Sequence, residues 1–154
     1  MSMSSLLDQK AIVLKMAAKN STEVIERLGG ILRELGCVAD DFVEATLARE
    51  AEMPTGLPLG GEVNAAIPHV DLEYVKRPAL ALATLKEPVD FQNMVDPSEA
   101  VPTQLVIMLA LDQPKSQVEM LQEVAGVLQR PDVVDRLMGA STADEVFAIL
   151  DSPQ

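Results

Sequence analysis

The sequence predicts an α/β fold in which a mixed β-sheet of about four to five strands is sandwiched between helices, in a three-layer αβα arrangement. Strand-like apolar runs alternate with segments of helical periodicity along the chain. Residues 79–85 and 105–111 are continuously apolar, as strands covered on both faces are. The length of 154 residues and the apolar fraction of 48% fit a single domain. We expect it to span residues 1–154, with a core of about 6–151 and flexible ends.

The N-terminal part is predicted to hold a strand followed by a helix. Residues 11–16 read as a weak strand, although a helical interpretation competes. A helix is predicted to begin after Asn20 or Ser21 as its cap and to end at Gly36. Its apolar positions recur at helical spacing: Val24, Ile25, Leu28, Ile31, Leu32 and Leu35.

A second helix is predicted to begin at Asp41, which with Glu44 reads as a capping pair. We expect this helix to continue to about Ala51, because Pro54 and Gly56 follow and end it.

The middle of the chain is predicted to supply most of the sheet. Residues 63–67 alternate between apolar and small or polar side chains, and the two apolar runs 79–85 and 105–111 are the buried strands. Residues 89–91 are expected to pair at an edge of the sheet. Residues 96–102 (DPSEAVP) are expected to form a surface connection.

Three helices are predicted to close the chain. Residues 116–119 read as a capping box at the start of the first. Pro131 is expected to open a short helix that ends at Gly139. Ser141 with Asp144 is expected to cap the last helix.

Composition excludes several classes of protein. The net charge of −12 argues against a nucleic-acid-binding protein, which needs a basic surface, and against binding to an anionic membrane. A single cysteine, Cys37, cannot form an internal disulfide and indicates a reducing compartment. The longest strongly apolar run, 105–111, is too short to span a bilayer, and the N-terminus does not read as a secretory signal. We therefore expect a cytoplasmic protein.

The one histidine, His69, is the leading candidate for chemistry. A lone histidine is more often structural than catalytic, but this one follows the end of a predicted strand. Pro68 cannot donate to a β-ladder, so it ends the pairing and fixes the backbone just before His69. In open α/β sheets, ligands gather beyond strand ends. Imidazole has an ordinary pKa of about 6.5 and can act as a neutral nucleophile at cytoplasmic pH.

Other chemistries have weaker support. One histidine and one cysteine make a zinc site improbable, and the sequence contains neither a P-loop nor a GxGxxG motif. A Ser-His-Asp triad stays open, although no GxSxG pattern is present. What remains is imidazole as a covalent nucleophile, with phosphorus as the favoured electrophile.

Phosphoryl transfer would require a cation and N–H donors near the histidine. Arg49 lies among carboxylates, so it forms either a solvated salt bridge or a planar fork for phosphate oxygens. Thr55 and Gly56 could offer a hydroxyl and a free N–H, or simply end the preceding helix. Gln117 is expected in the first turn of its helix, where free N–H groups favour an anion, although a polar residue is also ordinary there.

Two motifs carry a family resemblance. Residues 48–56 (AREAEMPTG) and 65–69 (AAIPH) resemble the signature of the fructose/mannitol-type (type 2) IIA components of the bacterial phosphoenolpyruvate-dependent sugar phosphotransferase system. In that family the pattern is Arg-Glu, a small residue and Thr-Gly, a variable loop, and then Ala-Ile-Pro-His. The resemblance covers nearly the whole chain. The first motif, together with residues 112–121, is most similar to the galactitol-specific branch. Many family members carry a second active-site histidine at the position of Gln117.

The resemblance implies a phosphocarrier that uses no metal and no organic cofactor. The histidine matching His69 accepts a phosphoryl group on Nε2 from HPr and passes it to a cysteine of the IIB component. The membrane component IIC is a partner only indirectly, and the transported compound would be a sugar alcohol, galactitol. The residue matching Arg49 supports the phosphate. We expect Leu57, Ile67 and Val70 to form an apolar docking rim, with core burial an equal alternative for Ile67.

Two alternatives remain. A regulatory relative of the IIA components would accept phosphate but signal by binding other proteins. A pure binding domain would leave His69 chemically inert.

Overall fold

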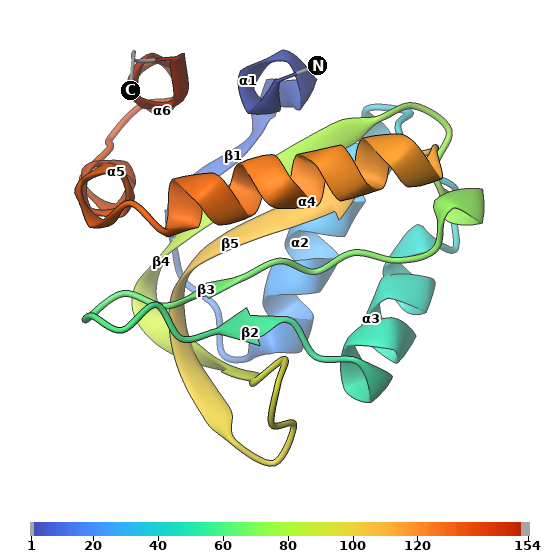
Figure 1. Cartoon of the computed structure of the whole chain (residues 1–154). Helices are drawn as coiled ribbons and strands as arrows, with labels where there is room; N and C mark the ends of the chain where they lie inside the picture. The colour runs from blue at the N-terminus through green and yellow to red at the C-terminus, as the bar shows by residue number, and fades with distance from the viewer. Residues whose placement is uncertain (1, 152–154) are drawn as a thin grey trace.

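A mixed β-sheet forms the middle layer of the structure, a computed structural model that describes residues 2–151 (Figure 1). Within these residues the sheet has five strands in the order β1-β4-β5-β3-β2. The strands are β1 (Leu7–Met16), β2 (Gly56–Leu57), β3 (Ala65–Ala66), β4 (Ala79–Gln92) and β5 (Ala100–Ala110). β1 pairs with β4 and β3 with β5 in parallel, whereas β4 pairs with β5 and β2 with β3 in antiparallel. The predicted mixed sheet is confirmed.

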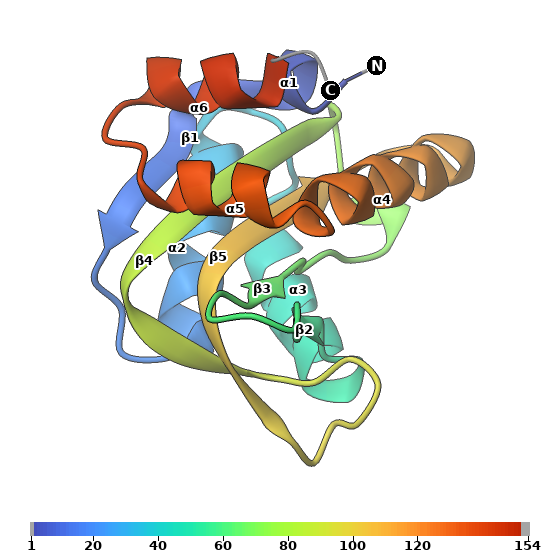
Figure 2. The same ribbon diagram turned by 60° about the vertical axis from the view of Figure 1, so that its left-hand side comes forward.

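Helices cover both faces of the sheet, as Figures 1 and 2 show. The α-helices are α1 (Met3–Leu6), α2 (Ser21–Glu34), α3 (Phe42–Glu52), α4 (Pro114–Leu128), α5 (Pro131–Met138) and α6 (Ala143–Asp151), and a 3₁₀ helix, η1, spans Leu72–Tyr74. α2 and α3 lie on one face, while α4, α5, α6 and α1 lie on the other. The predicted three-layer arrangement of a single domain is therefore confirmed.

The central strands divide their side chains between the two layers with the period of two that a pleated strand imposes. In β4, Ala79, Ala81 and Ala83 face the core shared with α2, and Leu80 and Leu82 face the core shared with α4 and α5. All five are buried. The small alanine side chains lie on the α2 side, and the larger leucines fill the other layer.

The strands differ from the sequence-based expectation in length. Residues 11–16 belong to β1, which begins at Leu7, so the competing helical interpretation is wrong. Residues 89–91 are not a separate short strand, because they continue β4 and pair with β5. The β4–β5 pairing shifts register between Thr84 and Val89, which accommodates Pro88 in the strand. Residues 96–102 are not wholly a loop, because β5 already begins at Ala100.

Three predicted caps differ from the structure, one in its bonding and two in their position. Asp41 precedes α3 but makes no side-chain capping bond. α4 begins at Pro114, so the box expected at residues 116–119 lies inside the helix. The last helix is capped by Thr142 rather than Ser141, because the Thr142 hydroxyl accepts the N–H of Glu145 at 3.2 Å.

The ends of the chain were expected to be flexible. Residues 3–6 form the short helix α1, and the side chain of its first residue, Met3, is only 3% exposed. The expected C-terminal tail, residues 152–154, lies outside the described residues.

Candidate functional site

His69 lies in the segment that leaves β3 and runs beside the end of β5. The pairing of β3 with β5 continues for one bond beyond β3, since the N–H of Leu109 donates to the carbonyl of Pro68 at 3.0 Å. Pro68 has no N–H of its own and offers the sheet nothing in return. His69 therefore lies where the segment departs from the sheet, and its side chain is half-buried.

The His69 ring is held in one tautomer. Nδ1 lies 2.8 Å from the carbonyl oxygen of Ile67. A carbonyl oxygen can only accept, so Nδ1 donates and carries the proton of the neutral ring. The lone pair that can attack an electrophile therefore belongs to Nε2.

The surroundings lower the pKa of His69 below its ordinary value of 6.5. Burial is the largest cause, since desolvation penalises the charged imidazolium. The bond to the Ile67 carbonyl opposes this shift, the positive charge of Arg49 adds to it, and the negative charge of Asp71 opposes it. The neutral, nucleophilic ring is consequently the dominant form at neutral pH.

Arg49 lies in the last turn of α3, on the side of the molecule that carries His69. Its Nη1 lies 3.3 Å from Oδ1 of Asp71, two residues beyond His69. Its Nε is buried and has no hydrogen-bond partner among the described residues. The salt bridge and the unoccupied donor coexist on one guanidinium, so both interpretations of Arg49 keep a structural basis.

Thr55 and Gly56 are held by contacts within the protein. The N–H of Thr55 donates to Oε2 of Glu50 at 2.8 Å, and its hydroxyl donates to Oε1 at 2.9 Å. Burial, the largest cause, raises the pKa of Glu50 in spite of these bonds. Gly56 belongs to β2, and a Cβ there would lie 2.6 Å from the carbonyl oxygen of Gln92. A close backbone approach therefore accounts for this glycine.

Gln117 lies deeper in its helix than expected. Its N–H donates to the carbonyl of Gln113 at 3.0 Å, so it is not one of the free donors of the first turn. Its half-buried side chain is at the beginning of α4. That end of α4 follows β5 by three residues and lies on the same side of the molecule as η1 (Figure 1). The amide side chain, rather than the backbone, is what Gln117 can offer.

The sequence patterns missed two charged residues of this site, Glu50 and Asp71. Glu50 is the second residue of the Arg-Glu motif and binds Thr55. Asp71 pairs with Arg49. The motif itself could have pointed to Glu50, whereas Asp71 is marked only by its position two residues after His69.

The expected apolar rim does not form around His69 as predicted. Ile67 and Val70 are 7% and 6% exposed, so both belong to the core. Leu57 is partly buried and packs against the core layer beneath α4 and α5. The large apolar side chains that are exposed within residues 2–151 are Met53, Met94, Val95 and Val118.

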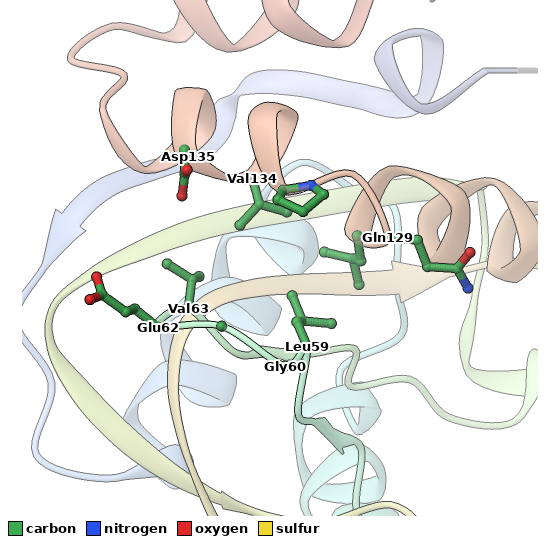
Figure 3. A pocket seen from close by; sticks show the side chains of 10 residues that line it. Leu59, Gly60, Glu62, Val63, Gln129, Val134 and Asp135 are labelled. Carbon is green, nitrogen blue, oxygen red and sulfur yellow. The ribbon is translucent and has the colours of Figure 1, made fainter.

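A cavity of about 350 Å³ lies apart from this site, between the loop that joins β2 to β3 and the junction of α4 with α5 (Figure 3). Leu59 and Val63 line it from the loop, and Val134 lines it from α5. Glu62 and Asp135 add carboxylates. None of the residues discussed around His69 contributes to its lining.

Two kinds of feature are absent from the described residues. No helix within residues 2–151 is long and apolar enough to cross a membrane. Nor does this part of the chain contain a cluster of three or more histidine, cysteine, aspartate or glutamate side chains placed to hold a metal ion.

The chain is similar in sequence to known proteins. Residues 5–152 match the family model for "Phosphoenolpyruvate-dependent sugar phosphotransferase system, EIIA 2". The galactitol-specific EIIA component of Escherichia coli K12 is 37% identical over 118 residues, which cover 76% of this chain and 77% of the relative.

Solved structures show the same fold at moderate identity. The complex of enzyme IIAMTL with phosphorylated enzyme IIBMTL from Escherichia coli contains a chain with a TM-score of 0.76 and 26% identity, covering 94% of this chain and 98% of that one. The nitrogen regulatory protein IIA-Ntr of Neisseria meningitidis has a TM-score of 0.75 and 29% identity, covering 96% and 97%.

Proposed function

The chain belongs to the EIIA 2 family of the phosphoenolpyruvate-dependent sugar phosphotransferase system, whose members transfer phosphoryl groups, and from this premise we propose that His69 is its phosphoryl-accepting residue. The observation that carries the proposal is the bond from Nδ1 of His69 to the Ile67 carbonyl. This bond leaves Nε2 as the nucleophile of a neutral ring.

The chemical step exchanges one P–N bond for another. Nε2 of His69 attacks the phosphorus of a phosphohistidine donor, and the bond between phosphorus and the donor nitrogen breaks. The proton on Nδ1 stays in its bond to Ile67, which also stabilises the positive charge that develops on the ring. Burial of His69 favours the unprotonated form that attacks.

Arg49 is the cation that would stabilise the transferred group. A phosphoryl group on nitrogen carries close to two negative charges, and a guanidinium can bind its oxygens in a planar, bidentate way. Nε of Arg49 has no partner within residues 2–151, and Nη1 makes a single contact, with Asp71, so the guanidinium has donors available for phosphate oxygens. The half-buried amide of Gln117 is a second candidate for orienting the phosphate.

The partners proposed for this chain follow from its family. HPr would donate the phosphoryl group, and a cysteine of a IIB component would receive it, with the membrane component IIC involved only indirectly. A related IIA chain has been solved in complex with phosphorylated enzyme IIBMTL, which supports a IIB component as the acceptor. The 37% identity to a galactitol-specific EIIA component supports galactitol as the transported compound.

Labelling the purified protein tests this function. The wild-type chain, incubated with phosphoenolpyruvate, enzyme I and HPr, should take up one acid-labile phosphate per chain, and adding a galactitol IIB component should remove it. His69→Ala should take up none. A His69→Ala protein that still incorporates label would overturn the assignment.

A regulatory function is the second candidate, because the nitrogen regulatory protein IIA-Ntr shares this fold at 29% identity. A regulatory protein would accept phosphate on His69 but would not restore galactitol uptake in cells that supply galactitol IIB and IIC components and lack their own IIA. Restored uptake that depends on His69 would favour the transport function.

A further inference from the structure

The ion pair of Arg49 with Asp71 is a feature that phosphoryl acceptance by His69 does not itself require. The contact from Nη1 to Oδ1 measures 3.3 Å, and the two side chains are 31% and 67% exposed. Such an exposed, single-contact pair is weak and easily exchanged. The neighbouring Nε of the same guanidinium is buried without a hydrogen-bond partner in the described part of the chain. Within the described residues, the ion pair with Asp71 is thus a weak contact of Arg49, and its Nε remains available as a donor.

We infer that Asp71 is a positioning residue, which occupies the guanidinium of Arg49 in the unphosphorylated protein and is displaced from it by the phosphoryl group on His69. This role presupposes the phosphocarrier function proposed above. It adds to that function a carboxylate that competes with the phosphoryl group for Arg49.

The backbone after β3 brings the two competitors to the same guanidinium. Val70, between His69 and Asp71, is 6% exposed and packs in the core shared with α2 and α3. His69 is half-buried and Asp71 is exposed on either side of the buried Val70, so both side chains point away from that core. The segment is fixed on each side of them, by the bond from Leu109 to Pro68 and by the bond from the N–H of Tyr74 to the carbonyl of Asp71.

Charge decides the competition. A phosphoryl group carries about −1.5 to −2 charges and three acceptor oxygens, whereas the carboxylate of Asp71 carries one charge. The phosphoryl group therefore displaces the carboxylate, which is released to water. The exchange replaces one anionic partner of the guanidinium by another and forms or breaks no covalent bond. Because an existing ion pair must be broken, part of the stabilisation of the phosphohistidine is lost, and the group is passed on more readily.

The equilibrium of the phosphoryl group between HPr and this protein tests the competition. Asp71→Asn keeps the shape of the side chain and removes its charge, so the equilibrium should shift toward this protein by up to about fivefold, the upper range for an exposed ion pair. Glu73→Gln is the matched control, because it removes the same charge two residues further along, at an exposed position in η1. Its equilibrium should equal that of the wild type.

A double-mutant cycle shows whether Asp71 acts through Arg49. In an Arg49→Ala background, Asp71→Asn should shift the equilibrium much less, since the competed cation is gone and only the direct repulsion between Asp71 and the phosphoryl group is relieved. A second readout needs no phosphate: Asp71→Asn should lower the pKa of His69 further, because the charge of Asp71 raises it, and NMR of the one histidine ring reports this directly.

The outcomes separate the two proposals. If wild-type His69 takes up no phosphate, the phosphocarrier function and the role of Asp71 both fall. If labelling is normal but Asp71→Asn behaves like Glu73→Gln, or if its shift is undiminished without Arg49, only the role of Asp71 is overturned.

Discussion

Four neighbouring residues set the position, the tautomer and the pKa of the His69 ring. Pro68 ends the pairing with β5, so the ring lies at the rim of the sheet. The carbonyl of Ile67 fixes the proton on Nδ1. Arg49 and Asp71 act on the pKa of the ring in opposite directions. These contacts leave Nε2 as the unprotonated nitrogen of the ring, which is the atom that the proposed function requires.

The pKa of His69 gives a first prediction at this scale. Because burial lowers it below 6.5, the ring should stay neutral as the pH falls to that value and should protonate only at lower pH. NMR titration of the ring in the folded protein measures the midpoint. The same shift makes stability decline as the pH falls through about 6.5, since the unfolded chain then binds a proton that the folded chain does not. A folded-state midpoint above 6.5 would contradict the burial seen here.

Arg49 gives the second prediction. Arg49→Ala should raise the barrier to phosphoryl transfer onto His69 by about 2–4 kcal/mol, as the loss of other preorganised charge-stabilising groups does. It should also raise the pKa of His69, because the positive charge of Arg49 lowers it. Rapid-quench transfer kinetics and NMR titration check the two effects. Arg33→Ala, in the last turn of α2, is the matched control. Unchanged transfer in Arg49→Ala with an intact fold would reduce Arg49 to a surface salt bridge.

Among the secondary-structure elements, α2 and α3 determine where Arg49 lies, because they pack against each other beside the sheet. Gly29 of α2 allows this close packing, since a Cβ there would lie 2.7 Å from Cγ2 of Val43 in α3. A Cβ added at Gly30, the next residue, would have no neighbouring atom within 4 Å. An added methyl group would therefore clash with α3 at Gly29 but not at Gly30.

These glycines give the third prediction. Gly30→Ala should raise the free energy of unfolding by about 0.5–1 kcal/mol, because alanine has the higher helix propensity and meets no neighbour. Gly29→Ala should lose that gain, and be less stable than Gly30→Ala by at least about 1 kcal/mol, since Val43 or the whole of α3 must move. Urea denaturation of both variants measures the difference. Equal stabilities would show that α3 is not held close to α2.

The long elements were predictable from the sequence, and the short ones were not. The helix from Ser21 to Glu34 and the continuous strands of residues 79–85 and 105–111 show their period or their apolar composition over many residues. β2 and η1 have two and three residues, too few for any period to appear. Asn20 and Asp41 are N-cap residues as predicted, whereas the caps of α4 and α6 were misplaced because polar residues occur at several neighbouring positions.

The residues of the candidate site were predictable from the sequence, but the contacts between them were not. His69 and Arg49 could be singled out from their residue types and from the motifs around them. The contact with Asp71 could not, because it depends on how closely the end of α3 approaches the segment after β3. The binding of Thr55 by Glu50 likewise depends on the turn that follows α3.

At the scale of the whole molecule, the net charge of −12 acts on stability as well as on encounters with partners. Like charges repel in the compact state, and salt screens them. The free energy of unfolding should therefore rise between about 0.01 M and about 0.1 M salt, over which the Debye length falls from about 30 Å to about 10 Å. Thermal or urea unfolding across this range checks the fourth prediction.

A charge-reduced variant is the control for this effect. Glu62, Glu87 and Glu123 are exposed, and replacing all three with glutamine removes three negative charges from the surface. This variant should gain less stability from added salt than the wild type. An equal gain in both proteins would mean that salt acts by some route other than screening.

The most direct test of the account is the NMR spectrum of the phosphorylated protein, in which the one histidine leaves no ambiguity of assignment. After incubation with phosphoenolpyruvate, enzyme I and HPr, a long-range ¹H–¹⁵N spectrum should show phosphorus coupled to Nε2 of His69, with Nδ1 still protonated in its bond to Ile67. Phosphate on Nδ1, or on any residue other than His69, would contradict the account.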